Sequence, residues 1–485
     1  MCFVRTLFNQ TTWIPLIHSH FAAHWNGTVV KRLKMWSKIK GHVVVFYRRF
    51  QHTCEHLTVH GPSFFVRKDV HFIYRLIYFI IYVQVWIAAV ATIRRYYNHY
   101  QENTIRFTTR TDYLDWNTTF ASITLCEIPN VDKIYMLSQE INPGDKGKLD
   151  RFIGEIGFFN GLCHSCFALC DNEPLCPTDF GQLSLAVRSE CKDFLLSCKW
   201  NGNPFECCGS FQPIITEYGT CYSMNNVHGL EESPVYQTSN KDRQASIEIV
   251  ASQDYEAFLH APEDIPFWNM EYDRRLTVLY GAEANVIYSI TNVVNEPEVS
   301  LLSPEYRQCR FPNEVPENYI AYKFYSYSGC ISQCRIDAQL ELCNCTHHFS
   351  PQIYEERYCD LEGLKCLSNN FRILRKLKVP GMNETGLICD CLPSCEEPDY
   401  NVVAKDFLEP EENVRARGAK FSLSNRPYER ITRQVARTTL DLVVAIGNSF
   451  GLCFGGSLLS IVEVFYYLLI FVLIGYFVLK FSKYR

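Results

Sequence analysis

Two long apolar stretches dominate the hydrophobic pattern of this chain. Residues 70–91 read VHFIYRLIYFIIYVQVWIAAVA, and residues 440–479 contain only two charged side chains, Asp441 and Glu463. Both stretches exceed the roughly 18 to 20 apolar residues that a bilayer-spanning helix needs. The start of the chain lacks the basic segment, apolar core and small-residue cleavage site of a signal peptide. The pattern therefore predicts two transmembrane helices, the first of which serves as a signal anchor.

Weaker periodicities between the two spans predict a domain of mixed secondary structure. Apolar and polar side chains alternate in residues 246–250 and 285–294, a pattern typical of half-buried strands. A later segment has helical spacing, with Cys330 and Cys334 on one face. Residues 126–221 are rich in cysteine and interrupted by Pro and Gly, so we expect disulfides rather than periodicity to set their conformation. These patterns predict an α+β membrane protein.

Charge orients the two spans. Residues 1–69 hold ten Lys and Arg against two acidic residues, so this tail carries +8, and residues 480–485 carry +3. Because the whole chain has a net charge of −5, the remaining residues 70–479 carry −16. Segments rich in Lys and Arg beside a span stay in the cytoplasm. We therefore expect both termini in the cytoplasm and the acidic region outside the cell.

Cysteine usage supports the same topology. Twenty of the 23 cysteines lie between Cys126 and Cys395, an even number that suits as many as ten disulfides in an oxidising compartment. The region between the two apolar stretches contains three N-glycosylation sequons, at Asn117, Asn344 and Asn383. Two further sequons, at Asn9 and Asn26, lie in the basic tail, so the cysteines weigh more than the sequons.

Motifs of enzymes and metal centres are missing from the sequence of this region. It has no Gly-x-Ser-x-Gly elbow, no His-Glu-x-x-His helix and no phosphate loop. Cys163 and Cys166 have the spacing of half a zinc site, but outside the cell a disulfide is the expected pairing. We therefore expect no catalytic residue, no metal, no cofactor and no nucleic-acid partner.

The second apolar stretch is about 40 residues long, twice what one straight crossing needs. Its middle contains two adjacent glycines, which can leave helical geometry at little steric cost. Unwound backbone at membrane depth is tolerated only against protein or a water-filled path. Its carbonyls and hydroxyls could replace part of an ion's water shell, and a carboxylate on the same helical arc would attract cations. The residues concerned are Gly455, Gly456, Ser457, Ser460 and Glu463.

A different interpretation of the same stretch needs no pore. Gly447, Gly451 and Gly455 are spaced four apart and could form a close helix-packing face. The chain would then be a cysteine-rich receptor or adhesion subunit, or an auxiliary subunit that does not conduct alone. The double length, the Gly-Gly-Ser break and the inward Glu463 favour the pore.

Several motifs resemble those of the degenerin/epithelial sodium channel family, over roughly residues 58–467. Residues 446–469, IGNSFGLCFGGSLLSIVEVFYYLL, are similar to the family's second span, whose filter is a Gly-x-Ser or Ser-x-Ser triplet. Thr58-Val-His60-Gly61 resembles its His-Gly gating motif. Residues 120–126 resemble its post-span motif, with Ala121 in place of proline. The insect pickpocket branch fits best.

The resemblance extends to the cysteine-rich segments. Residues 220–225 are similar to the family's Gly-x-Cys-Tyr-x-Phe-Asn, with Met224 in place of Phe. Four further segments look like its cysteine-rich thumb: residues 303–309, 325–330, 343–345 and 389–395. The cysteines that we expect in structural disulfides are Cys126, Cys221, Cys309, Cys330, Cys334, Cys343, Cys345, Cys359, Cys366, Cys389, Cys391 and Cys395.

The resemblance implies a trimeric channel subunit in the plasma membrane, with two transmembrane helices and a large disulfide-rich extracellular domain that has a β-sheet palm and peripheral helices. The implied segments are a cytoplasmic tail with the His-Gly motif (1–69), the first transmembrane helix (70–93), the cysteine-rich extracellular domain (94–435), the pore-lining segment (436–479) and a cytoplasmic tail (480–485). Membrane lipid and related subunits, in a homo- or heterotrimer, are the implied partners.

Passive, amiloride-sensitive Na⁺ transport, gated by a ligand or another stimulus, is the implied function. Gly455, Gly456 and Ser457 would form the narrowest ring. The pore and gating residues would be Asn448, Ser460, Glu463, Asp441, His60 and Gly61. Asn448 stands where relatives carry Gly, Ala or Ser and where bulky side chains hold them open. Asp441 lies one turn before Ala445, the position where acid-sensing relatives place an aspartate.

Overall fold

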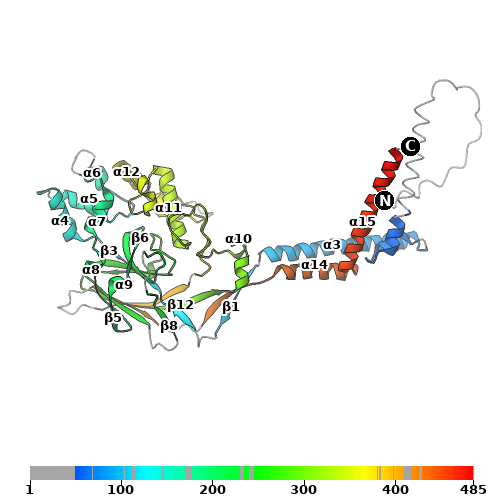
Figure 1. The fold of residues 1–485 in the computed structure, drawn as a ribbon, viewed down its shortest axis with the longest axis horizontal. Coiled ribbons are helices and arrows are strands. Elements are labelled where there is room, and N and C mark those ends of the chain that lie inside the picture. Colours follow the sequence, from blue (N-terminus) through cyan, green and yellow to red (C-terminus); the bar gives the residue numbers. More distant parts are fainter. Residues whose placement is uncertain are drawn as a thin grey trace, which may run out of the picture. The chain divides into compact units, whose positions relative to one another are not determined.

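The computed structural model describes residues 48–483, except for residues 49, 68, 103, 112–115, 145–146, 171–175, 230–233, 240–244, 380, 382–383, 397, 409–416 and 425–428. Side chains are described as far as residue 470, apart from that of residue 102. The sequons at Asn383, Asn9 and Asn26 lie outside the described residues. The chain forms two compact units: a helical unit of Met1–Tyr100 with Thr438–Arg485, and a cysteine-rich unit of Gln101–Arg437 (Figure 1).

The helical unit contains the two apolar stretches. Its helices include α2 (Pro62–Val66), α3 (Phe72–Glu102), α14 (Thr439–Phe454) and α15 (Leu458–Lys483). The first stretch forms a 31-residue helix that continues past the predicted end at residue 93, because no glycine or proline interrupts it. Among the described residues, Phe72–Gln101 is long and apolar enough to cross a bilayer alone. Thr439–Phe454 and Leu458–Ile470 meet that requirement only as a pair, bent by 75°.

Local chemistry sets both ends of α14. Thr438 and Asp441 form a capping box at its start, in which the Thr438 side chain accepts from the Asp441 N–H and Asp441 Oδ2 accepts from the Thr438 N–H at 2.8 Å. At its other end, Gly455 adopts a left-handed conformation with φ 60°. A residue in this conformation ends the helix, and glycine adopts it without the steric cost of a β-carbon.

One mixed sheet and one antiparallel sheet form the centre of the cysteine-rich unit. In the larger sheet the order of strands is β1 (Ile105–Arg110), β15 (Arg430–Val435), β12 (Glu283–Asn295), β14 (Arg417–Leu423), β9 (Ser246–Ala251), β4 (Leu195–Trp200) and β5 (Asn203–Phe205), with β13 (Asp399–Leu408) also paired to β12. The smaller sheet runs β11 (Arg275–Val278), β10 (Tyr255–His260), β3 (Ser122–Glu127), β7 (Gly219–Met224) and β6 (Gln212–Thr216). A short pair joins β2 (Asn117–Thr119) to β8 (Gln237–Ser239).

The two strands that the alternating pattern predicts are β9 and β12. Ile247 and Ile249 of β9 are buried and alternate with half-buried neighbours, as expected of a strand with one face on the core. Tyr288 of β12 and Phe120 are fully buried in the same apolar cluster, with ring centroids 5.5 Å apart. The prediction of mixed α and β structure is confirmed for this unit.

The longer helices of the cysteine-rich unit lie together at one end of it (Figure 1). The longer ones are α4 (Val131–Ile141), α5 (Lys148–Gly157), α7 (Phe180–Val187), α11 (Tyr327–Cys343) and α12 (Leu361–Asn369). The shorter ones are α6 (Ser165–Ala168), α8 (Cys191–Phe194), α9 (Cys207–Ser210), α10 (Pro304–Arg307), α13 (Phe371–Arg375), η2 (Tyr272–Arg274), η3 (Pro297–Leu301) and η4 (Gln352–Arg357). A second apolar core lies among them and contains Phe152, Ile156, Leu364 and Leu367.

The twenty cysteines from Cys126 to Cys395 form ten disulfides. Five join cysteines within residues 126–221: Cys126–Cys221, Cys163–Cys166, Cys170–Cys176, Cys191–Cys208 and Cys198–Cys207. The other five join cysteines within residues 309–395: Cys309–Cys395, Cys330–Cys391, Cys334–Cys389, Cys343–Cys366 and Cys345–Cys359. Cys163 and Cys166 therefore pair with each other, and no cluster of three or more metal-binding side chains occurs in the described part of the chain.

Candidate pore and gating site

The helical break at residues 455–457 has its own hydrogen bonds. The N–H of Gly455 donates to the carbonyl oxygen of Gly451 at 2.8 Å and closes the last turn of α14. Ser457 caps the start of α15, because its hydroxyl accepts from the Ser460 N–H at 3.3 Å while the Ser460 hydroxyl accepts from the Ser457 N–H at 3.1 Å. This reciprocal cap stabilises the start of a second helix directly after the first.

The segment before the first span packs against this break. The N–H of His60 donates to the carbonyl oxygen of Phe454 at 2.9 Å. A β-carbon placed on Gly455 would lie against the His60 imidazole, so only glycine permits this close approach. Residues predicted from two distant parts of the sequence, His60 and Gly455, are therefore neighbours in the structure.

Thr58 connects the same segment to the polar face of α15. Its N–H donates to Glu463 Oε2 at 3.1 Å, and its hydroxyl donates to the same oxygen at 2.5 Å. The Thr58 hydroxyl also lies 2.9 Å from the Ser460 hydroxyl, which is itself 3.3 Å from the Ser457 hydroxyl. A continuous row of polar groups thus runs from Ser457 to Glu463 along one side of α15.

Glu463 is a half-buried carboxylate in a predominantly apolar helix. The hydrogen bonds that it accepts come from Thr58, which is uncharged. Among the described residues it has no ion-pair partner. A carboxylate in such a segment is expected to face water, a partner or a permeating ion, because desolvating its charge is costly.

Aromatic side chains support the contact between the two segments. Tyr82 packs over Gly61, which has φ 117° and leaves no room for a β-carbon beneath that ring. The rings of Trp86 and Phe454 lie 4.4 Å apart, centroid to centroid. Val59 and Phe454 are buried in this cluster, so the contact between the pre-span segment and the break includes apolar packing as well as hydrogen bonds.

The structure does not bring Asn448 and Asp441 into this cluster. Asn448 is exposed on α14, about two turns before Gly455. Asp441 is exposed at the start of α14, where its carboxylate accepts from Thr438. The cluster itself contains Gly455, Gly456, Ser457, Ser460, Glu463, His60 and Gly61.

Sequence reasoning missed three contributors to the site: Thr58, Tyr82 and Trp86. Thr58 was part of the His-Gly motif but received no role of its own. A signal was present, since Ser460 and Glu463 require polar partners that an apolar span cannot supply. Tyr82 and Trp86 are four residues apart on α3, the spacing that places two side chains on one helix face.

Comparison with known proteins identifies the family. The family model "Amiloride-sensitive sodium channel" matches residues 53–467. The chain belongs to the amiloride-sensitive sodium channel family. The match includes the pre-span segment, the cysteine-rich unit and the helical break. Members of this family are ion channels rather than enzymes, so the prediction that the chain is not an enzyme is confirmed.

Individual relatives place the chain within this family. The sodium channel protein Nach of Drosophila ananassae is 24% identical over 465 residues, 87% of this chain and 86% of that protein. Its counterpart in Drosophila melanogaster is 23% identical over 490 residues, 89% of this chain and 88% of the relative. Pickpocket protein 19 of D. melanogaster is 22% identical over 305 residues, 56% of this chain and 59% of that protein. These similarities confirm the prediction of the insect pickpocket branch.

Proposed function

We propose that this chain is a subunit of a plasma-membrane channel that passes Na⁺ passively when a stimulus acts on its cysteine-rich unit. Gly455, Gly456 and Ser457 form the selectivity filter in this proposal, and the cysteine-rich unit is extracellular. The observation that carries it is the break of α14 and α15 inside one apolar segment, with polar groups of the pre-span segment packed against it. Membership of a channel family supports the same function.

The polar row on α15 suits the path of a small cation. Unwound backbone offers carbonyl oxygens that can replace water around Na⁺, and Ser457 adds a hydroxyl. Glu463 then supplies a negative charge two turns inward, which raises the local concentration of cations. Amiloride sensitivity is proposed from family membership.

The exposed apolar surface of the helical unit requires partners. Leu452, Leu458 and Leu459 have exposed fractions of 90%, 83% and 78% in the single chain. Such side chains need to be covered by lipid or by other subunits. One break cannot surround an ion, so we propose a homo- or heterotrimer with related subunits, each with two spans and both termini in the cytoplasm.

In this proposal the contact of His60 with Phe454 is a gating element. Because the His60 N–H satisfies a carbonyl at the end of α14, displacement of the pre-span segment leaves that carbonyl to water or to an ion. Movement of residues 58–61 therefore changes the polar lining next to the filter.

Expression in oocytes tests the proposal. We expect a current whose reversal potential shifts when external Na⁺ is replaced by a large organic cation. Asn448→Trp should increase this current if the side chain at 448 controls opening. Absence of current from the wild type and from Asn448→Trp, alone and with related subunits, would favour the receptor or auxiliary alternative.

Ser457→Cys tests the filter residue directly. A thiol in the filter should make the current sensitive to block by Cd²⁺ or change the ratio of Na⁺ to K⁺ permeability. The wild type is the matched control, since its Cys453 takes part in no disulfide and lies four residues away. An unchanged permeability ratio and unchanged Cd²⁺ response would remove Ser457 from the filter.

A further inference from the structure

The disulfides divide the cysteine-rich unit into two separately cross-linked parts. We name residues 126–221 the first cysteine block and residues 309–395 the second cysteine block. Each block contains five disulfides, and none of the ten joins one block to the other. Cross-links stiffen each block internally, so relative movement is expected where the two meet without a covalent bond.

The two blocks meet in a packed junction. Phe152 and Ile156 of the first block share an apolar core with Leu364 and Leu367 of the second. His348 Nε2 lies 2.9 Å from the carbonyl oxygen of Ile156. A packed junction of this kind moves between discrete arrangements rather than deforming continuously.

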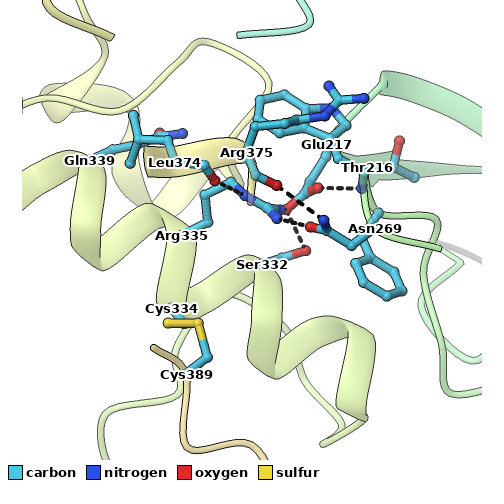
Figure 2. A network of polar contacts seen from close by, with 12 residues as sticks. Thr216, Glu217, Asn269, Ser332, Cys334, Arg335, Gln339, Leu374, Arg375 and Cys389 are labelled. Carbon is cyan, nitrogen blue, oxygen red and sulfur yellow. Dashed lines mark hydrogen bonds and ion pairs between the residues drawn. A yellow bond between two sulfur atoms is a disulfide. The ribbon is translucent and has the colours of Figure 1, made fainter. Parts of the chain in front are cut away.

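A buried ion pair lies in this junction (Figure 2). Glu217, in the turn between β6 and β7, belongs to the first block, and Arg335 on α11 belongs to the second. Their side chains are 5% and 1% exposed. Glu217 also accepts from the Ser332 hydroxyl at 3.0 Å and from the Trp268 N–H at 2.7 Å. Every oxygen of this carboxylate is therefore engaged within the protein.

Arg335 extends the network to two further segments, as Figure 2 shows. Its Nε donates to the carbonyl oxygen of Leu374 at 2.9 Å, and its Nη2 donates to Asn269 Oδ1. Asn269 in turn donates to the carbonyl oxygen of Arg375 at 3.0 Å. One guanidinium thus positions α11, α13, the β6–β7 turn and the segment that follows β10. Removal of one partner from a buried pair leaves an unpaired charge and is strongly destabilising, whereas removal of both is much less so.

The junction also contains polar groups that this arrangement leaves unused. Among the described residues, Trp268 Nε1 and His348 Nδ1 are buried and have no hydrogen-bond partner. A cavity of about 10 Å³ in the same junction is lined by residues of both blocks, including Glu217, Arg335 and His347. Trp268 Nε1 is a donor, and His348 Nδ1 is an acceptor because Nε2 donates to the Ile156 carbonyl oxygen. A second packing arrangement could therefore supply hydrogen bonds that this one lacks.

The base of the second block is connected to the pore segment through β15. Arg433 of β15 donates to the carbonyl oxygen of Cys395 at 3.1 Å and contacts the Cys309 sulfur at 2.8 Å. The disulfide Cys309–Cys395 closes the second block at this point. Strand β15 ends at Val435, and α14 begins four residues later. Three residues of chain therefore separate β15 from α14.

From these observations we propose that the junction between the two cysteine blocks is the moving joint of the cysteine-rich unit, and that the Glu217–Arg335 pair is the lock that holds it. The proposal rests on the proposed function, because the movement is taken to gate the pore. The lock opens when a stimulus favours the second packing arrangement, and the second block then carries β15 and α14 with it.

Hydrogen exchange of the purified full-length protein tests whether the joint opens. In Glu217→Gln and in Arg335→Met, we expect amides of residues 212–224 and 327–343 to exchange at least about tenfold faster than in the wild type. The double variant carries no unpaired buried charge, so its exchange should return toward the wild-type rate. Arg417→Met is the control, because Arg417 is also largely buried but pairs with Asp254, which belongs to neither block. The proposed joint would be contradicted if amide exchange in residues 212–224 and 327–343 did not change, or if exchange in β1 and β15 rose by the same factor.

Currents test whether the joint controls the pore. For each variant we would measure current per surface-labelled channel, with and without Asn448→Trp, which separates opening from conduction. A lock variant should change the ratio of these two currents at least about threefold, while Arg417→Met leaves it unchanged. An unchanged ratio in conducting channels overturns the coupling and leaves the proposed pore intact.

Where Arg335→Met does not reach the membrane, Arg335→Lys retains the charge but not the three-way contact and serves in its place. Absence of current from every Asn448→Trp channel contradicts the pore, and hydrogen exchange then decides the joint alone.

Discussion

The backbone N–H of His60 donates to the carbonyl oxygen of Phe454 at 2.9 Å, which joins the segment before the first span to the last residue of α14. Carbonyl groups at the end of a helix lack partners within that helix. In an apolar environment such a group needs a donor from elsewhere in the protein. The pre-span segment supplies it, so the break in the second apolar segment depends on residues almost 400 positions earlier.

Gly455→Ala should weaken this contact. Its β-carbon would lie against the His60 imidazole, and alanine is unfavourable at φ 60° by about 1 kcal/mol. We expect current per surface channel to fall by about fivefold or more. Gly447→Ala is the matched control, because a β-carbon there meets no atom within 4 Å. Equal currents from the two variants would show that the approach of His60 to Gly455 has no role in conduction.

Thr58→Val should release Glu463. Valine has nearly the shape of threonine but lacks the hydroxyl that donates to Glu463 and contacts Ser460. Loss of a hydrogen bond to a charged group of this exposure is expected to cost about 1 kcal/mol. We expect an altered ratio of Na⁺ to K⁺ permeability, measured from reversal potentials. Thr58→Ser retains the hydroxyl and should behave as the wild type, and a serine variant that matches Thr58→Val would contradict the assignment.

Acid should destabilise the cysteine-rich unit through two buried histidines. Burial lowers the pKa of His347 to about 3 and that of His348 to about 4. In the unfolded chain histidine binds a proton near pH 6.5, so stability is full above that pH and is lost as the pH falls toward these lower values. Burial raises the pKa of Glu263 to about 7, and this carboxyl group stabilises the fold increasingly as the pH falls from 7 to about 4.5.

As the pH falls, the buried histidines lower the stability and Glu263 raises it. The wild type alone cannot separate these effects, so the measurement compares variants. The melting temperature of purified protein should fall less between pH 7.5 and pH 5 in His347→Phe than in the wild type, by about 3 °C or more. His164→Gln alters an exposed histidine and should leave the pH dependence unchanged. If the melting temperature of His347→Phe changed with pH as much as that of the wild type, His347 would not be the group that titrates.

Glycosylation should report the orientation of the two units. Asn117 and Asn344 are exposed, and Asn344 stands just after the end of α11. Glycosidase treatment should increase the gel mobility of the wild type by removing its glycans. We expect Asn117→Gln and Asn344→Gln each to lack one glycan and so to reduce this change by one step. Asn9→Gln and Asn26→Gln should change nothing, because that tail is proposed to stay in the cytoplasm. A glycan on either tail residue would reverse the proposed topology.

Much of the fold could be predicted from local sequence patterns, and the exceptions have physical causes. The spacing around Cys330 and Cys334 predicts α11, and the structure begins this helix at Tyr327 because Ser326 caps it. Helix α5 was missed even though Leu149, Phe152 and Ile156 recur at helical spacing and are buried. Its signal was passed over because the surrounding cysteines suggested irregular structure.

The candidate site could be predicted in part. Gly455, Gly456 and Ser457 mark the break because two glycines and a capping hydroxyl are local signals. The contact of Thr58 with Glu463 spans 405 positions, and no local pattern identifies a partner at that distance. The Glu217–Arg335 pair was missed for the same reason, since each residue taken alone resembles an ordinary surface charge.

The segregation of the disulfides also has a consequence for biosynthesis. Every partner of a cysteine in residues 126–221 is already available before residue 309 is translated. Oxidation can therefore follow the ribosome, and the first half of the molecule can reach its native covalent state while the second is still being made. A nascent chain arrested shortly after residue 300 should already contain the five native disulfides of residues 126–221, with no non-native cysteine pairs.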